Sequence, residues 1–238
     1  MIGKASEHWL YTITLIVSFD DAIKADAFPA QAIAGRWIDP RSRESWQYNI
    51  DLAIEACELG FDEIQLDYIR FPSGQAVAES GQLDLSQEER VDAVTAYLNE
   101  MRRALHPLGC SVSGDIFAIV VSSPTDQGIG QRPEELSMQL DALSPMIYPS
   151  HYSEGWLGFA DPNEHPYDVT HDAIGDSLRR VEPGTLVRPW LQSFWWTSAQ
   201  IRRSIQAAED LGVGWMLWNI VSDYSIQSLP TDDEVSGS

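Results

Sequence analysis

Two aspartates occupy matching places in two apolar segments. Asp67 lies in Glu63–Phe71, and Asp115 lies in the next apolar segment, Ser111–Ala118. Neighbouring parallel strands lie about 4.8 Å apart, so carboxylates on them reach the separations of glycosidases, about 5–5.5 Å for retention and about 6.5–9.5 Å for inversion. Crowding raises one pKa and leaves the other group ionised. We predict Asp67 as nucleophile or base and Asp115 as general acid.

A second cluster combines a phenol with an imidazole. Tyr148, His151 and Tyr152 lie within residues 145–152, where two prolines restrict the shape of the chain. We predict that Tyr148 and His151 orient the catalytic groups and that Tyr152 contacts the substrate. A packed tyrosine with a loop histidine is the structural alternative, and the residues leave both open.

Tryptophans near predicted strand ends point to a sugar ligand. Aromatic faces stack on sugar rings and tolerate a neutral polar ligand. Trp190 and Trp218 have the parity that faces inward, which makes them the best candidates among the nine tryptophans. The predicted substrate-binding residues are Gln65, Arg70, Tyr152, Arg188, Trp190, Gln192 and Trp218.

Elements that would position these residues alternate along the chain. Apolar segments occur at Tyr11–Phe19, Glu63–Phe71, Ser111–Ala118, Ala142–Pro149, Leu186–Phe194 and Gly214–Ile220. Helical patterns lie between them at Glu44–Leu59, Gln87–Leu105, Glu134–Leu140, Asp168–Val181 and Ser198–Leu211. Alternating strands and helices imply a parallel sheet, and no glycine-rich turn favours an open nucleotide-binding fold. We predict an α/β fold, a TIM-type (β/α) barrel that is incomplete, with about six βα units.

Parity within the strands supports a closed interior. Ile64, Leu66 and Tyr68 share one face of their strand, while Gln65 and Asp67 share the other. An apolar face suits the helices, and a polar face suits a barrel interior whose site lies at the carboxyl ends of the strands. Ser86 and Glu89 predict a capping box, and glycines 60, 109 and 212 follow predicted helices, where a left-handed cap favours glycine.

Charge and composition exclude several classes of partner. A formal net charge of −21 repels nucleic acid and anionic membranes, whereas a neutral polysaccharide would feel little of this field. No motif for a cofactor or a histidine-rich metal centre is present, so we predict neither. A hydrolase that holds a metal ion through Asp20, Asp67 and Asp115 is an alternative to a glycosidase without a metal. Cys57 and Cys110 are predicted to be free, buried thiols.

Residues 1–229 are predicted to form one domain, followed by a disordered tail at residues 230–238. The apolar run Leu10–Phe19 is interrupted by threonines and lacks a cleavage site, so no signal peptide is predicted. We expect a soluble chain, extracellular or at the cell surface if sequence upstream is missing.

Four blocks of this sequence resemble a glycosyl hydrolase domain family of unknown function. They are Gly60–Pro72, Ser144–Tyr152, Arg188–Gln192 and Gly214–Asn219. The resemblance implies a TIM-barrel glycosidase, and we predict a polysaccharide or oligosaccharide as its substrate. The family has two further βα units before the segment matching Tyr11–Phe19, so we expect open barrel edges that a truncated gene, a homodimer or rearranged packing would explain.

A comparison with a second family refines this expectation. Aligned with family 18 chitinases, the chain has Ile69 where their acidic glutamate would lie, which disfavours a chitinase mechanism. A carbohydrate-binding or relic domain that has lost catalysis is the alternative to an enzyme.

Overall fold

The computed structural model describes residues 2–230, which form two compact units. The first comprises residues 2–143 and 181–185, and the second comprises residues 144–180 and 186–230. From residue 231 onward, the tail predicted to be disordered lies outside the described residues. Within residues 2–230, no helix combines the length and apolar character that crossing a bilayer requires.

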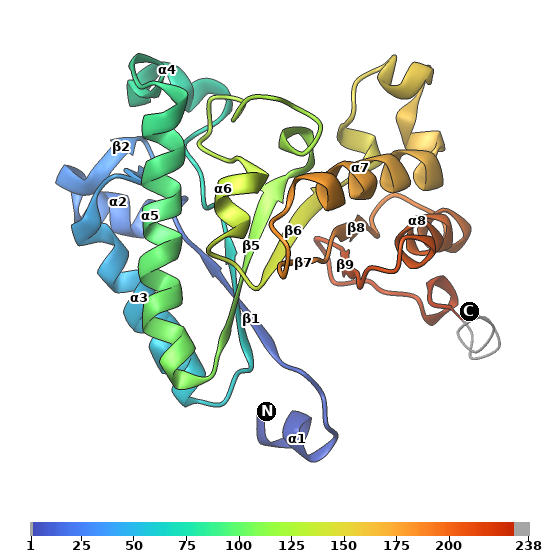
Figure 1. The fold of residues 1–238 in the computed structure, drawn as a ribbon, viewed down its shortest axis with the longest axis horizontal. Helices are drawn as coiled ribbons and strands as arrows, with labels where there is room; N and C mark the ends of the chain where they lie inside the picture. The colour runs from blue at the N-terminus through green and yellow to red at the C-terminus, as the bar shows by residue number, and fades with distance from the viewer. Residues whose placement is uncertain (1, 231–238) are drawn as a thin grey trace. The chain divides into compact units, whose positions relative to one another are not determined.

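The first unit contains three parallel strands joined by long helices (Figure 1). Its helices are α1 (Ile2–Glu7), α2 (Ala22–Ala27), α3 (Arg43–Glu58), α4 (Val77–Ser80), α5 (Gln87–Leu105) and α6 (Pro133–Ser137). Its strands are β1 (Ile13–Val17), β2 (Ala32–Ala34), β3 (Trp37–Ile38), β4 (Glu63–Asp67) and β5 (Ser111–Phe117). β4 pairs with β1 on one side and β5 on the other, because α3 and α5 return the chain to the same edge for each new strand.

The predicted parity of the strands is seen in β4 and β5. Ile64, Leu66, Val112 and Ile116 are fully buried and form the apolar face of the sheet. Burial of each such side chain stabilises the fold by about 1.5–3 kcal/mol. The opposite face carries Glu63, Gln65, Ser113 and Asp115, all at most 3% exposed. Buried polar groups require partners, so this second face must be hydrogen-bonded throughout.

Gly114 allows close packing behind the ends of these strands. A Cβ atom added at Gly114 would lie 2.8 Å from Ile69 Cδ1 and 2.9 Å from Leu140 Cδ1. A larger residue would therefore require the side chains of Ile69 and Leu140 to move.

A small excursion after β1 was not predicted from the sequence. Asp21 caps α2 by accepting a hydrogen bond from the backbone of Lys24 at 2.9 Å, and the antiparallel pair β2–β3 follows. An isolated backbone bridge then joins Asp20 to Trp37. The excursion thereby returns Arg36 and Trp37 to the carboxyl end of β1.

The two cysteines form a disulfide, so the prediction of free thiols was wrong. Cys57 lies near the end of α3 and Cys110 immediately precedes β5, with their Cα atoms 6.0 Å apart. A helix that runs antiparallel to its sheet ends at the edge where strands begin, so the two positions meet although 53 residues separate them. Closing a loop of this length stabilises the fold by about 2–4 kcal/mol.

The second unit also combines parallel strands with helices. Residues 146–147 of β6 (Ala142–Ile147) pair with β8, and β8 pairs with β9. The remaining elements are α7 (Pro166–Arg180), β7 (Leu186–Val187), β8 (Trp190–Gln192), α8 (Ser198–Asp210) and β9 (Met216–Trp218). α7 and α8 pack against each other, with the buried hydroxyl of Thr170 donating to Ser204 Oγ at 3.2 Å.

Most predicted elements are found near their expected positions. All five helices are present, and α5 has its predicted bounds together with the Ser86–Glu89 capping box. The strand predicted at Leu186–Phe194 is instead two short strands, β7 and β8, separated by residues 188–189. Pro189 has no N–H to donate, which interrupts the ladder there. Short 3-10 turns occur at residues 29–31, 74–76, 82–84, 106–108, 118–120, 149–151, 156–158, 162–164 and 226–228.

Candidate active site

Asp67 ends β4 and is partly buried at the carboxyl edge of the sheet. The backbone N–H of Tyr68 donates to Asp67 Oδ1 at 2.6 Å. Burial raises the pKa of Asp67, and the negative charge of Asp20 raises it further, although the Tyr68 N–H and the charge of Arg70 oppose this. A carboxyl group with a raised pKa is suited to donating a proton.

Tyr68 takes the chain out of the strand in a left-handed conformation. Its φ is +52°, a region that non-glycine residues occupy at a cost of about 1–3 kcal/mol. The prediction that Tyr68 continues the apolar face of the strand was therefore wrong, because the strand ends one residue earlier. Its ring lies beside Trp37, with the centroids 5.8 Å apart. The turn redirects the following residues, including Arg70, around the end of the sheet.

Arg70, a predicted substrate-binding residue, is 5% exposed and enclosed by aromatic rings. Its guanidinium carbon lies 4.6 Å from the ring centroid of Trp37, 5.1 Å from Tyr68 and 4.4 Å from Phe117. Nη1 donates to the carbonyl of Phe71 at 3.0 Å. Burial lowers the pKa of Arg70 from its ordinary value. Arg70 is therefore a buried positive charge whose electrostatic effect reaches Asp67, and its predicted contact with substrate stays a prediction.

Asp115 lies on β5 beside Asp67, as predicted from the strand pattern. The register pairs Leu66 with Gly114, so the next residues along the two strands are the two aspartates. Asp115 is 2% exposed, and Gln65 Nε2 donates to its Oδ1.

The interior face below the aspartates is a continuous polar network. The Ser113 hydroxyl lies within hydrogen-bond distance of Glu63 Oε1 and of Gln65 Oε1, the latter at 2.6 Å. The Tyr11 hydroxyl donates to Glu63 Oε2 at 3.1 Å. Because Gln65 bridges Ser113 and Asp115, its position supports Asp115 directly, and its predicted contact with substrate stays a prediction.

Asp20 is a further acidic residue that the sequence assigned only to a metal site. It follows β1, and its side chain is 11% exposed and accepts a hydrogen bond from Arg36 Nε. The register of β1 with β4 aligns Val17 with Asp67, so both aspartates lie at the same edge. The sequence signal for Asp20 was its position directly after the strand predicted at Tyr11–Phe19. Across residues 2–230, no group of three or more His, Cys, Asp or Glu is placed to hold a metal ion, so the geometry gives the metal hypothesis no support.

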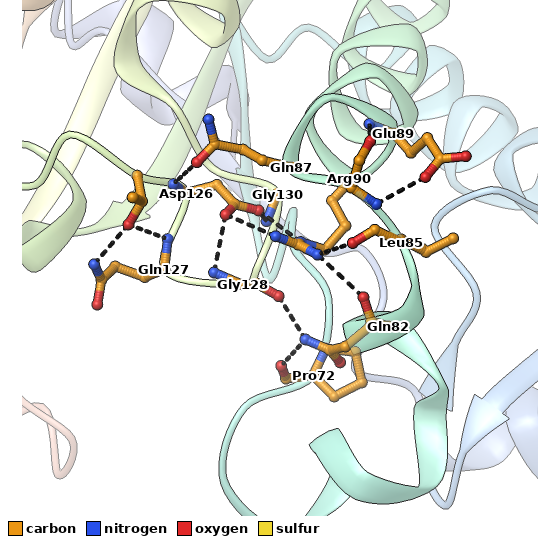
Figure 2. A network of polar contacts seen from close by, with 12 residues as sticks. Pro72, Gln82, Leu85, Gln87, Glu89, Arg90, Asp126, Gln127, Gly128 and Gly130 are labelled. Atoms are coloured by element: carbon orange, nitrogen blue, oxygen red, sulfur yellow. Dashed lines mark hydrogen bonds and ion pairs between the residues drawn. The ribbon is translucent and has the colours of Figure 1, made fainter.

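A buried ion pair anchors the loop after β5 (Figure 2). Arg90 Nε donates to Asp126 Oδ2 at 2.7 Å, and Nη2 donates to Oδ1 at 3.0 Å. The backbone N–H groups of Gly128 and Gly130 also donate to Asp126, at 3.0 and 2.9 Å. Burial would raise the pKa of Asp126, but the bonds from Arg90 and the two glycines outweigh it and hold the pKa below its ordinary value.

Gln82 links this loop to the one after β4 (Figure 2). Its Nε2 donates to the carbonyl of Gly128 at 2.6 Å and to that of Pro72 at 3.0 Å. Arg90 Nη1 donates to the carbonyls of Gln82 and Leu85, at 3.1 and 2.6 Å. One buried cation therefore holds both loops that leave the strands carrying Asp67 and Asp115.

Gln131 joins the ends of these two strands. It is 1% exposed, and its Oε1 accepts from the backbone of Phe117 at 3.0 Å. Its Nε2 donates to the carbonyls of Asp115 and Ile69, at 3.1 and 3.3 Å. Neither Gln131 nor the Arg90–Asp126 pair was identified from the sequence, because their partners are far apart in the chain.

In the second unit, the rings of Tyr148 and His151 lie together, and their predicted role in orienting the catalytic groups stays a prediction. Their ring centroids are 5.4 Å apart in an edge-on arrangement, and Phe194 lies 5.4 Å from Tyr148 and 6.1 Å from His151. Tyr148 is 8% exposed, whereas His151 is exposed. Desolvation by these neighbours lowers the pKa of His151, which favours the neutral imidazole at neutral pH.

The other predicted binding residues of this unit differ in exposure. Gln192 is fully buried: Oε1 accepts from Ser150, and Nε2 donates to the carbonyl of Phe194 at 3.1 Å. Its predicted contact with substrate stays a prediction. Trp190 and Trp218 form an edge-on pair 5.8 Å apart, with Trp218 38% exposed.

Tyr152 and Arg188 complete the predicted binding set of the second unit. Within the described residues the buried hydroxyl of Tyr152 has no hydrogen-bond partner, and burial raises its pKa. Arg188 is half-buried. The substrate contacts predicted for both residues stay predictions.

Comparisons with known proteins agree on the fold. The glycoside hydrolase domain of PgaB (BpsB) from Bordetella bronchiseptica is 12% identical, with a TM-score of 0.66 over 90% of this chain and 72% of that one. A class V chitinase from Pseudomonas fluorescens is 15% identical, with a TM-score of 0.62 over 95% and 83%. Aspergillus fumigatus Ega3, solved in complex with galactosamine, is 11% identical, with a TM-score of 0.59 over 92% and 78%.

These likenesses confirm the predicted fold, an incomplete TIM-type βα barrel. Comparison with curated protein sequences finds no match. The family model described as "Putative glycosyl hydrolase domain" matches residues 1–224, which confirms the resemblance found in the four sequence blocks. The chain therefore belongs to this family of glycosyl hydrolase domains.

Proposed function

We propose that this protein is a glycoside hydrolase that cleaves glycosidic bonds in a polysaccharide through Asp67 and Asp115. The observation that carries the proposal is the partly buried Asp67 at the carboxyl end of β4, whose pKa is raised by burial. Membership of the glycosyl hydrolase domain family supports this reaction class. Sugar specificity is suggested only by analogy with the chitinase and the galactosamine-bound Ega3.

For these two aspartates we propose the opposite roles to those expected from the sequence. Asp67, with its raised pKa, is the proton donor to the leaving group. Asp115, which follows Gly114 on the neighbouring strand and accepts a hydrogen bond from Gln65, is the second carboxyl group of the proposed pair. The negative charge of Asp20 keeps Asp67 protonated to higher pH. Two carboxyl groups with opposite protonation states are what acid-assisted glycoside cleavage requires.

The test is hydrolysis of a panel of soluble polysaccharides by the full chain. The panel includes glycol chitin, chitosan and a galactosamine polymer, with reducing ends as the readout. Asp67→Asn and Asp115→Asn should each lower turnover by at least about a hundredfold, the range typical of lost acid–base catalysis. Asp51→Asn, at an exposed position on α3, is the matched control and should retain parental turnover.

Asp20→Asn separates the proposed roles. Removing its charge should lower the pKa of Asp67, so the alkaline limb of the pH profile moves to lower pH while turnover persists. An Asp67→Asn variant with parental turnover would refute the assignment. A folded parent that binds a polysaccharide without cleaving it would instead establish the non-catalytic alternative.

A further inference from the structure

Trp195 is an exposed aromatic residue held in an unfavourable backbone conformation. It follows β8, its side chain is 82% exposed, and its φ is +61°. Exposing a large apolar side chain to water costs free energy, and a residue with a Cβ is strained in the left-handed region. Neither property stabilises the folded state, so stability does not explain why an exposed tryptophan occupies this position.

The chain before Trp195 is held by buried hydrogen bonds. Ser193 N donates to the carbonyl of Trp218 at 2.9 Å, and Asn219 Nδ2 donates to the carbonyl of Ser193. Gln192 Nε2 donates to the carbonyl of Phe194 at 3.1 Å. The backbone therefore reaches Trp195 with little freedom.

The chain after Trp195 is held as firmly. Trp196 Nε1 donates to Asn163 Oδ1 at 2.8 Å. Thr197 and Gln200 form a capping box that starts α8. With both neighbours anchored, the left-handed conformation directs the indole outward. Strain that the surroundings enforce in this way is typical of ligand-binding positions.

The indole also has a rigid support. The ring of Phe194 lies 5.0 Å from it in an edge-on arrangement, and Phe194 is itself 9% exposed and packed on Tyr148 and His151. This leaves most of the indole open to solvent on a fixed base. A ring ordered before binding loses little conformational entropy when a ligand arrives.

We propose that Trp195 is a stacking platform that binds a sugar ring of the polysaccharide chain. The inference rests on the proposed carbohydrate substrate and names a binding position in the second unit. A flat, exposed indole fits the C–H face of a pyranose, whose hydroxyl groups stay in water. Its location after a strand, at the carboxyl edge where sites of this fold lie, favours a sugar over a protein partner.

The experiment measures binding of the full chain to glycol chitin, chitosan and a galactosamine polymer by affinity electrophoresis. Trp195→Gly removes the indole and also relieves the left-handed strain, so its melting temperature should equal or exceed that of the parent. For whichever of the three polymers the parent binds, we expect the Kd of Trp195→Gly to be at least about tenfold higher. Trp195→Phe keeps a ring and should lose about threefold or less.

Trp9→Gly is the matched control. Trp9 is also left-handed, with φ +57°, and 95% exposed, but it lies in the first unit near the end of α1. The same substitution there should leave polymer binding unchanged. Trp195→Asn provides a second variant, since asparagine tolerates left-handed φ.

The outcomes separate this inference from the proposed reaction. Unchanged binding by Trp195→Gly, or a folded parent that binds none of the three polymers, overturns the platform. Loss of binding in Trp195→Gly from a parent without turnover supports the platform and refutes the hydrolase. Turnover in the parent together with a parental Kd in Trp195→Gly supports the hydrolase and overturns the platform.

Discussion

Asp67 is a residue whose proposed function conflicts with stability. Burial raises its pKa, which means that the folded state disfavours the carboxylate relative to the unfolded chain. Nothing in packing requires an acid here, because an amide would accept the same 2.6 Å hydrogen bond from Tyr68 N. Active sites commonly retain groups that destabilise the fold because activity requires them.

Replacing Asp67 with asparagine should therefore raise stability at neutral pH. We expect an increase of about 2–4 °C in Tm, which corresponds to ~1 kcal/mol in a chain of this size. Because the folded-state pKa is raised, the folded protein binds the proton more tightly, so parental stability falls as pH rises from 3.8 through that raised pKa. Thermal melts of both proteins as a function of pH provide the measurement.

The difference between the two melts should vanish below pH 3.8, where Asp67 is protonated in both states. Asp51→Asn, at an exposed position, should show no comparable gain. A variant less stable than the parent at neutral pH would show that the carboxylate stabilises the fold.

Strand parity was sufficient to predict the residues on β4 and β5, but not their partners. Alternation placed Asp67 and Asp115 on one face of neighbouring strands, and the register agrees. Asp20 was grouped with Asp67 only as a possible metal ligand, and its pairing with Arg36 was not predicted because it depends on an excursion that returns Trp37 to the same edge. Gln131 reaches both strand ends through contacts with no local sequence signal.

At the scale of elements, long helices with periodic apolar residues were predictable and short irregular ones were not. α5 has a capping box and an apolar face, both local signals, and its bounds match the prediction. β2 and β3 are short and lack alternation, so tertiary contacts decide their conformation. The disulfide between α3 and β5 depends on which ends of elements meet, and spacing alone could not reveal it.

The Arg90–Asp126 pair connects the helix α5 to the loop after β5, and we expect it to stabilise both elements. Arg90→Met leaves the carboxylate of Asp126, which is 2% exposed, without its cation (Figure 2). Breaking a buried pair on one side costs about 3–5 kcal/mol, and chemical denaturation measures it. Arg103→Met, at an exposed ion pair on the same helix, should cost under about 1 kcal/mol.

The double variant Arg90→Met/Asp126→Asn tests the electrostatic part of this cost. With no charge left buried, it should be more stable than the sum of the single variants predicts, by about 1–3 kcal/mol. Hydrogen exchange in residues 123–131 should increase in the single variants. Additive losses would show that packing, and not the ion pair, holds the loop.

At the scale of the whole molecule, net charge should distinguish among the polysaccharides proposed as ligands. A net charge of −21 creates a negative potential that attracts cations and raises their association rate. A neutral N-acetylated polymer gains nothing from this field, whereas a polymer with free amines carries positive charge at neutral pH. The acidic composition therefore favours amino sugar polymers, independently of which residues contact the ring.

Salt should separate the two classes of ligand. Between about 0.05 M and about 0.5 M NaCl, the Debye length falls severalfold, so the affinity of the full chain for chitosan oligomers should drop by about tenfold or more. Affinity for N-acetylated chitin oligomers should change by less than about twofold, because no charge is screened. Titration calorimetry at several salt concentrations measures both.

Trp195→Gly decides whether the attraction leads to binding at the proposed platform. If chitosan oligomers remain bound to this variant at low salt, the charge holds them without stacking, and the field acts as a general attraction. If binding is lost, the field concentrates the polymer and the indole holds it, since Trp195 carries no charge of its own. Equal salt dependence for chitin and chitosan oligomers would contradict the preference for amino sugars and leave shape as the only basis for selection.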